Sequence, residues 1–186
     1  MRLRIAVLAR SPVAGQVKTR LIPRLGAAGA ARLQAALTRR ALQRACALPD
    51  ANVVLWVAGP IDHAFIVQCQ CDWPIEVRAQ PDGDLGVRML AAIEDGAINE
   101  AAVLVIGTDC PAQTSADLAA ARLALAEHEL VVQPAHDGGY VLIGMREARP
   151  EIFSDIAWGS AQVLAVTMAR ARAASPFFTS RPNSEK

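Results

Sequence analysis

The chain has 186 residues, of which 53% are hydrophobic, enough for one domain with a single large core. No stretch reaches the roughly 20 apolar residues of a membrane span, and no short apolar run predicts a secretory signal, so a cytoplasmic protein is expected. The net charge is only +1, but the 49 residues before Asp50 hold ten of the 19 Lys and Arg residues and no carboxylate. This division predicts that something anionic binds near the N-terminal third.

Short apolar runs alternate with longer stretches of helical period, a pattern typical of a mostly parallel sheet covered by helices on both faces. The predicted strands are 3–9, 53–58, 75–79, 103–107, 130–134 and 140–144. The predicted helices are 29–48, 62–71, 86–99, 115–127 and 160–174. Asp62, Ser115 and Ser160 are the predicted N-caps.

The last two predicted strands differ from the others. Only the loop 135–139 separates them, which leaves no room for a crossover helix, so a hairpin or a split sheet is expected. The predicted fold is therefore a three-layer α/β/α domain with one antiparallel strand near the C-terminus. Residues 1–174 form this single domain in the prediction, and 175–186 form an irregular or disordered tail.

The N-terminal segment has a second interpretation, because Arg-rich and acid-free leaders are also typical of organelle transit peptides. Against it, residues 3–9 have the composition of a buried strand, and Pro12 and Pro23 interrupt any continuous amphipathic helix. Four cysteines are too few for a disulfide scaffold, and the close pair Cys69 and Cys71 has no second pair or His to complete a zinc site. Reduced, structural thiols are expected.

The loop that follows the first strand concentrates positive charge. In a parallel sheet, ligands bind beyond the carboxyl ends of the strands, and this loop carries Arg10, Gly15, Lys18 and Arg20. It lacks both the Gly-x-Gly-x-x-Gly fingerprint and the Walker A pattern, which disfavours a nicotinamide dehydrogenase and a P-loop NTPase. The remaining interpretation is a loop that holds a phosphate chain, with a solvated basic face as the alternative.

Acidic, amide and glycine residues follow three later strands. Asp109 stands at the end of an apolar run, where its carboxylate either binds a hard cation such as Mg²⁺ or caps the next helix. Asp137 and Gly138 either form a tight turn or line a ligand site, and Gly139 permits close approach to the backbone. Gln80 either hydrogen-bonds a nucleobase or closes its own loop. The residues alone leave these alternatives open.

Five ordered segments carry a resemblance to a known family. They are Ala9-Arg-Ser-Pro-Val-Ala-Gly-Gln-Val-Lys-Thr-Arg-Leu21, Gly83-Asp-Leu-Gly-x-Arg-Met89, Ile106-Gly-Thr-Asp-Cys-Pro111, Pro134-Ala-x-Asp-Gly-Gly-Tyr-x-Leu-Ile-Gly144 and Trp158-Gly-Ser-x-x-Val-Leu164. Over residues 3–168 the chain resembles the bacterial GT-A-type glycosyltransferase-like proteins of the nucleotide-diphospho-sugar transferase superfamily. Phospholactate guanylyltransferase and the molybdenum-cofactor nucleotidyltransferases are relatives in that superfamily.

The resemblance implies roles for the candidate residues. Arg10, Gly15, Lys18 and Arg20 would hold the nucleotide phosphates, Gln80, Gly83 and Gly86 would face the base, Asp109 would bind Mg²⁺ or Mn²⁺, and Asp137, Gly138 and Gly139 would line the acceptor side. Lys18 and Asp109 would be catalytic. The implied substrate is a nucleoside triphosphate or nucleotide sugar with an acceptor of unknown identity.

Two departures from the family pattern keep other functions open. Thr-Asp-Cys110 replaces the usual Asp-x-Asp triplet, and no counterpart of a later acidic Asp-x-Asp-Thr-like segment follows Phe177-Phe-Thr-Ser-Arg181. A metal-dependent glycosyltransferase is the leading expectation, a guanylyltransferase-like nucleotidyltransferase is the alternative, and a non-catalytic nucleotide-binding module is the second alternative. An RNA-binding protein is not expected with 4% aromatic residues, and whether the chain forms a homo-oligomer stays open.

Overall fold

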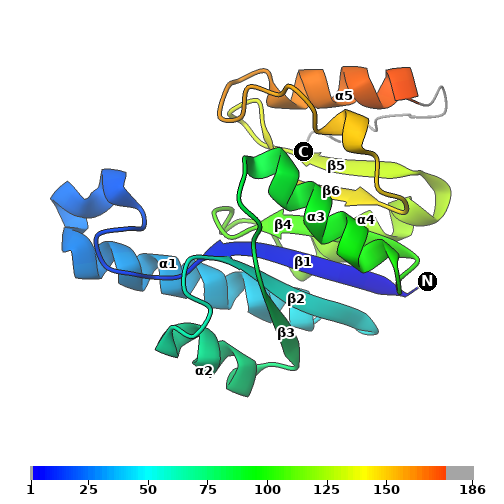
Figure 1. The fold of residues 1–186 in the computed structure, drawn as a ribbon. Helices are drawn as coiled ribbons and strands as arrows, with labels where there is room; N and C mark the ends of the chain where they lie inside the picture. The colour runs from blue at the N-terminus through cyan, green and yellow to red at the C-terminus, as the bar shows by residue number, and fades with distance from the viewer. Residues whose placement is uncertain (1, 175–186) are drawn as a thin grey trace.

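Six strands form one sheet in a computed structural model that describes residues 2–174 (Figure 1). Along the sheet, the order is β3-β2-β1-β4-β6-β5. The strands are β1 (Leu3–Arg10), β2 (Ala51–Ala58), β3 (Ile75–Ala79), β4 (Ala102–Gly107), β5 (Leu130–Pro134) and β6 (Tyr140–Met145). The predicted irregular tail, 175–186, lies outside the described residues.

The pairing of the strands confirms the predicted fold class. β1 is parallel to both β2 and β4, and β2 is parallel to β3. β6 runs antiparallel to β4 and to β5, so the short loop 135–139 closes a hairpin, as expected. The N-terminal segment is thus a central strand of the sheet.

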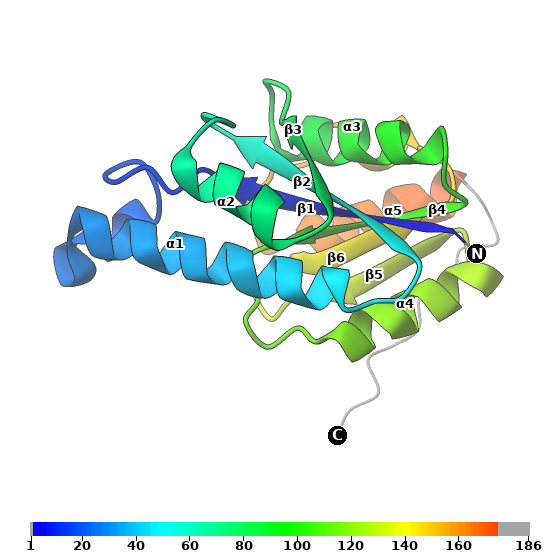
Figure 2. The ribbon, with the colours of Figure 1, turned by 90° about the horizontal axis from the view of Figure 1, so that it is seen from below.

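Helices cover both faces of the sheet, which gives the predicted three layers. The helices are α1 (Ile22–Cys46), α2 (Ala64–Asp72), α3 (Leu85–Ala97), α4 (Ser115–Glu127) and α5 (Val163–Ala174), with short 3-10 turns η1 (Thr19–Leu21) and η2 (Pro150–Ile152). α1, α2 and α4 lie on one side of the sheet, and α3 and α5 lie on the other (Figure 2). Within residues 2–174, no helix is both long and apolar enough to cross a bilayer.

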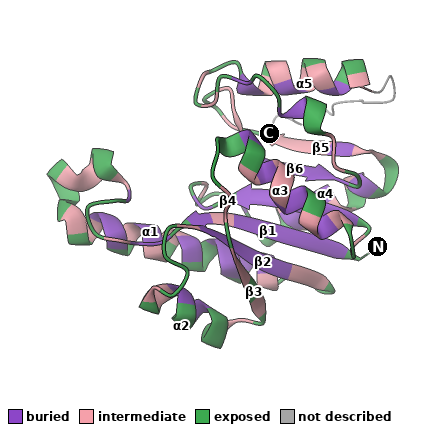
Figure 3. Cartoon of the chain, in the orientation of Figure 1, coloured by how far each residue is buried: buried purple, intermediate pink, exposed green. Residues whose placement is uncertain are grey.

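Alternating strand residues build two cores, one on each face. On β1, for example, Ile5 and Val7 pack toward α1, α2 and α4, whereas Ala6 packs toward α3 and α5. The strands at the centre of the sheet are therefore buried on both sides (Figure 3). The cysteines are all free thiols, as predicted.

The N-caps of α2 and α4 and the start of the first helix were predicted wrongly, whereas the predicted start of α4 at Ser115 is correct. Thr114, not Ser115, caps α4: its hydroxyl accepts a hydrogen bond from Asp117 N while the Asp117 carboxylate accepts one from Thr114 N. His63, not Asp62, caps α2, because its ring nitrogen Nδ1 accepts a hydrogen bond from Phe65 N at 3.1 Å. The first helix begins before the predicted residue 29, and Gly26, at φ 69°, interrupts it.

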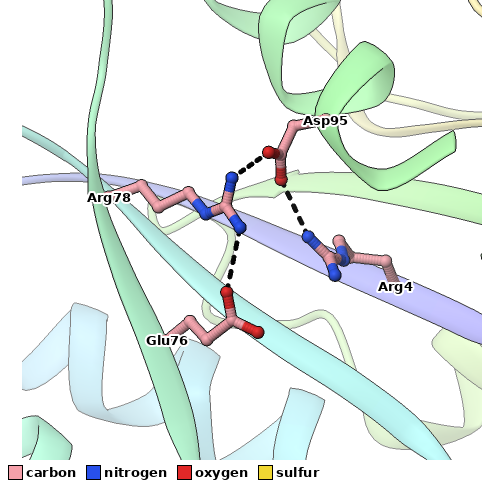
Figure 4. Close-up of polar contacts among 4 residues, drawn as sticks. All are labelled: Arg4, Glu76, Arg78 and Asp95. Atoms are coloured by element: carbon pink, nitrogen blue, oxygen red, sulfur yellow. Dashed lines mark hydrogen bonds and ion pairs between the residues drawn. The ribbon is translucent and has the colours of Figure 1, made fainter. Parts of the chain in front are cut away.

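A charge network that includes the buried Arg4 ties α3 to the sheet. Asp95 on α3 accepts hydrogen bonds from Arg4 on β1, at 2.8 Å, and from Arg78 on β3 (Figure 4). Arg78 also pairs with Glu76 at 3.0 Å. Arg4 is only 3% exposed, so Asp95 neutralises a charge that water does not reach.

The single tyrosine offers a pH test of the packing. Burial raises the pKa of Tyr140 to about 12, whereas an unfolded chain titrates near pH 10. We expect the phenolate absorbance of the native protein to appear near pH 12. Because the pKa of Tyr140 is higher in the folded state, its neutral hydroxyl contributes fully to the free energy of unfolding below about pH 10. This contribution is lost as the pH rises toward 12. A native titration near pH 10 would show that the hydroxyl is solvated.

Candidate functional site

A cleft of about 830 Å³ opens at the carboxyl ends of the parallel strands. It is bordered by residues from the loops after β1, β3 and β4 and from α1 and α3. Six of the predicted site residues border it: Arg10, Lys18, Arg20, Gln80, Gly83 and Asp109. With Arg88, four cationic side chains of the described residues border this cleft against one carboxylate, that of Asp109. Such a surplus of positive charge favours an anionic ligand.

The loop after β1 is anchored at both of its ends. Ser11 donates a hydrogen bond from its backbone N to Ala58 O at 3.0 Å and from Oγ to Pro60 O at 2.5 Å, which holds the loop against the end of β2. Val17 is 2% exposed and packs inward. Between these anchors the backbone turns, and Lys18 emerges in a left-handed conformation with φ 48°. A non-glycine residue in this region is uncommon and is often found at functional sites.

Lys18 and Asp109 form an ion pair across the cleft. Lys18 Nζ lies 2.5 Å from Asp109 Oδ1, and the two residues are 91 positions apart in the sequence. The Lys18 side chain is 16% exposed, whereas that of Asp109 is 73% exposed. The ammonium group is thus held inside the cleft by a carboxylate that still faces solvent.

A chain of hydrogen-bonded polar side chains leads from Asp109 to α1 and holds the carboxylate in place. Thr108 donates a hydrogen bond from Oγ1 to Asp109 Oδ1 at 3.1 Å, and Gln34 Nε2 on α1 donates to Thr108 Oγ1 at 3.4 Å. Thr38 Oγ1 also accepts from Gln34 Nε2, at 3.3 Å. Gln34 is 5% and Thr108 5% exposed, so this support lies in the protein interior.

Gln80 closes its own loop. Its side-chain Nε2 donates to two backbone oxygens, Ala9 O and Trp56 O, both at 2.9 Å. Its Oε1 accepts from Arg88 Nη1 at 3.3 Å. Both amide hydrogens are therefore committed to the ends of β1 and β2, which favours the loop-closing interpretation over direct contact with a nucleobase.

Comparison with known proteins places the chain in a family. Residues 30–160 match the family described as an uncharacterized protein conserved in bacteria (DUF2064). The chain belongs to the DUF2064 family. The matched range contains Gln34, Gln80, Arg88 and Asp109 of the cleft. No curated protein matches the sequence.

Several solved structures are similar to this DUF2064 chain. A candidate nucleotide-diphospho-sugar transferase from Desulfovibrio desulfuricans G20 is 29% identical, with a TM-score of 0.83 over 93% of this chain and 76% of that chain. A cytidylyltransferase from Leptospira borgpetersenii is 15% identical, with a TM-score of 0.61 over 99% of this chain and 77% of that one. A CMP:2-keto-3-deoxy-manno-octonic acid synthetase complexed with CTP is 9% identical, with a TM-score of 0.58 over 94% and 86%. The last two show the fold alone.

Two predicted nucleotide-binding glycines do not border the cleft in this DUF2064 chain. Gly15 lies at an exposed turn of the loop after β1, with φ 84°. Gly86 lies in α3, where a Cβ would come within 2.8 Å of the Trp158 ring and 2.9 Å of Phe153 O. The structure thus gives Gly86 a packing role between α3 and the loop before α5.

The predicted acceptor residues lie at the same end of the sheet, outside the cleft. The hairpin loop that holds them joins β5 to β6, and Leu142 of β6 pairs with Ile106 of β4 just before Asp109. Asp137 Oδ1 accepts a hydrogen bond from Gly139 N at 3.1 Å, and Gly138 O accepts one from Leu164 N at 2.9 Å. The turn interpretation accounts for these contacts, and a role toward an acceptor stays a prediction.

Gly138 and Gly15 form a matched pair for a stability test. Both have a φ near 85°, but a Cβ on Gly138 would overlap the Ala161 carbonyl oxygen, whereas the space around Gly15 is open. We expect Gly138→Ala to lower the free energy of unfolding by about 1–3 kcal/mol more than Gly15→Ala, measured by urea unfolding. Equal losses would mean that the loop moves away from Ala161 at no cost.

The residues of the cleft suit a metal ion that binds together with the phosphates of a nucleotide. Within the described residues there is no group of three His, Cys, Asp or Glu side chains that could hold an ion. Mg²⁺, however, often binds through one or two carboxylates together with water and substrate phosphates. Asp109 supplies one exposed carboxylate beside cationic groups that suit phosphates.

Sequence reasoning missed four polar residues of the site. Arg88 stands within the Gly83–Met89 segment and Thr108 precedes Asp109, so the quoted motifs contained both, but no role was predicted for either. Gln34 and Thr38 are polar side chains four residues apart in an Ala-rich helix, and both are buried. Their spacing, one helical turn, is the signal that could have identified them.

Proposed function

We propose that this protein is a metal-dependent transferase that binds a nucleotide sugar or a nucleoside triphosphate. The observation that carries the proposal is the cleft itself, where four cationic side chains and Asp109 meet at the strand ends. The 29% identical transferase of the same fold supports the substrate class. The resemblance noted in the sequence favours the glycosyltransferase label, and nucleotidyl transfer is the alternative.

Three of the cationic side chains, all from the loop after β1, would hold the phosphates. Arg10 and Arg20 present planar guanidinium groups, and Lys18 presents a point charge that is already positioned by its backbone and by Asp109. These groups would neutralise the negative charge that grows on the departing phosphates, which is the main requirement of such a reaction. A bound Mg²⁺ or Mn²⁺ would add to this neutralisation, and Asp109 is the residue that would hold it.

The two reactions differ in the bond that breaks. In glycosyl transfer, an acceptor hydroxyl oxygen attacks the anomeric carbon, a nucleoside diphosphate leaves, and a base takes the hydroxyl proton; Asp137 is the candidate base. In nucleotidyl transfer, an acceptor oxygen attacks the α-phosphorus and pyrophosphate leaves. Chromatography of products from a nucleoside triphosphate and from nucleotide sugars would distinguish pyrophosphate release from nucleoside diphosphate release.

Asp109→Asn tests the metal-dependent part of the proposal. In the native protein, Mg²⁺ should tighten nucleotide binding at least roughly tenfold, about 1.4 kcal/mol, in calorimetric titrations. Asp109→Asn should abolish that gain, because the amide cannot replace a carboxylate ligand. Binding without metal should be equal or tighter, since the substitution releases Lys18 for the phosphates.

The same titration separates the enzyme from a non-catalytic module. A native protein whose nucleotide binding gains nothing from Mg²⁺ or Mn²⁺, and which forms no product, would favour the module. A variant that keeps the full metal-dependent gain would show that another group holds the ion.

A further inference from the structure

Among the cationic residues that border the cleft within residues 2–174, Arg88 is the one that the phosphate-loop interpretation does not use. It lies on α3, and through Gln80 it is held beside the ends of β1 and β2. The Lys18–Asp109 pair lies at the end of β4, on the other side of β1. Gln80 thus anchors Arg88 on the β2 side of β1, whereas the Lys18–Asp109 pair lies on the β4 side.

Gln80 fixes the orientation of the Arg88 guanidinium. Because the Gln80 amide nitrogen donates to two backbone carbonyls, its oxygen must face the other way, where it accepts from Arg88 Nη1 at 3.3 Å. The Arg88 Nε is enclosed and has no hydrogen-bond partner among the described residues. A guanidinium held in this way on a glutamine is positioned before any ligand arrives.

Most of the donors of Arg88 are left for a ligand. A guanidinium has five N–H groups and no acceptor, and only the Nη1 contact with Gln80 is formed within residues 2–174. Arg88 makes no ion pair with any carboxylate in the same range. It therefore offers several donors and no acceptor to a ligand on the β2 side of the cleft.

We propose that Arg88 reads the base of the nucleotide and selects a keto base, guanine or uracil, over the amino bases adenine and cytosine. The proposal rests on the proposed function. The exocyclic oxygens of keto bases accept hydrogen bonds from a guanidinium, and guanine adds a second acceptor, N7, beside its oxygen. The amino groups of adenine and cytosine are donors, so at the same position they would face the guanidinium donors without a partner.

Binding of four diphosphates tests the base preference. In calorimetric titrations with Mg²⁺, we expect GDP and UDP to bind the native protein at least roughly tenfold more tightly than ADP and CDP. In Arg88→Gln, whose amide both donates and accepts, the preference should fall to within about threefold. Arg88→Lys keeps the charge but loses the planar fork, so it should also lose the preference. The melting temperature of each variant checks that it is folded.

The outcomes separate base reading from a phosphate contact. Equal weakening of all four ligands by Arg88→Gln, with recovery in Arg88→Lys, would assign Arg88 to the phosphates and overturn the proposal. Native protein that binds all four diphosphates equally would also overturn it, while leaving the proposed function intact. If none of the four binds, both the base preference and the proposed function fail.

Discussion

Lys18→Ala is expected to weaken nucleotide binding about 100-fold or more, about 2.7 kcal/mol or more. Within residues 2–174, Lys18 is the only lysine that borders the cleft, and its ammonium is held in place by its left-handed backbone and by Asp109. Removing it deletes a positioned charge and leaves Asp109 to repel the phosphates. Because Asp109 is mostly exposed, the folded state should lose little stability.

Arg24→Ala is the matched control for Lys18→Ala. It removes one positive charge from the same segment, but Arg24 is exposed and does not border the cleft. We expect it to change nucleotide affinity less than threefold, through long-range attraction only. Calorimetry at fixed salt would measure both variants. Equal effects of the two substitutions would reduce the role of Lys18 to a contribution to the overall charge.

Asp95→Ala is expected to lower the free energy of unfolding by about 3–5 kcal/mol. The substitution leaves Arg4 buried without its carboxylate, and Arg4 Nε already has no partner in the described part of the chain. It also removes the link between α3 and Arg78 of the edge strand β3. Most of this loss of stability arises because the charge of Arg4 stays buried without a partner, and less of it arises from the lost attraction between Arg4 and Asp95.

Glu94→Ala supplies the comparison on the same helix turn. Glu94 is exposed, so its removal should change the free energy of unfolding by no more than about 0.5 kcal/mol. Urea unfolding followed by circular dichroism would measure both. If Asp95→Ala costs under 1 kcal/mol, the Arg4 guanidinium must find water or another acceptor, and the network in Figure 4 is not required for the fold.

The strands were predictable because strands that are buried on both faces appear in the sequence as apolar runs. The apolar runs around Val7, Leu55 and Leu104 are uninterrupted, which is what strands buried on both faces require. Their order in the sheet was not predictable, since parallel strands joined by helices can be arranged in several ways with the same pattern. The N-caps of α2 and α4 were predicted wrongly for a local reason: whether His63 or Thr114 caps a helix depends on the direction of the backbone, which composition does not specify.

The candidate site was predictable only where a residue stands at the end of a strand. Lys18 and Asp109 follow β1 and β4, and parallel strands bring their carboxyl ends together. Arg88 and Gln34 come from helices, and their place at the cleft depends on how α3 and α1 pack on the sheet. The role of Gln80 could be assigned only from the positions of the two backbone carbonyls that accept its hydrogen bonds, and a sequence does not give these positions.

The most direct test of the central claim is to locate the bound nucleotide. In amide NMR spectra, UDP or GDP with Mg²⁺ should shift the signals of Lys18, Gly83 and Asp109, which border the proposed phosphate and base positions. The second cavity, about 430 Å³ beside Glu100 and Arg149 at the opposite end of the strands, should not respond. Shifts confined to that second cavity, or no shifts with any nucleotide, would contradict the account.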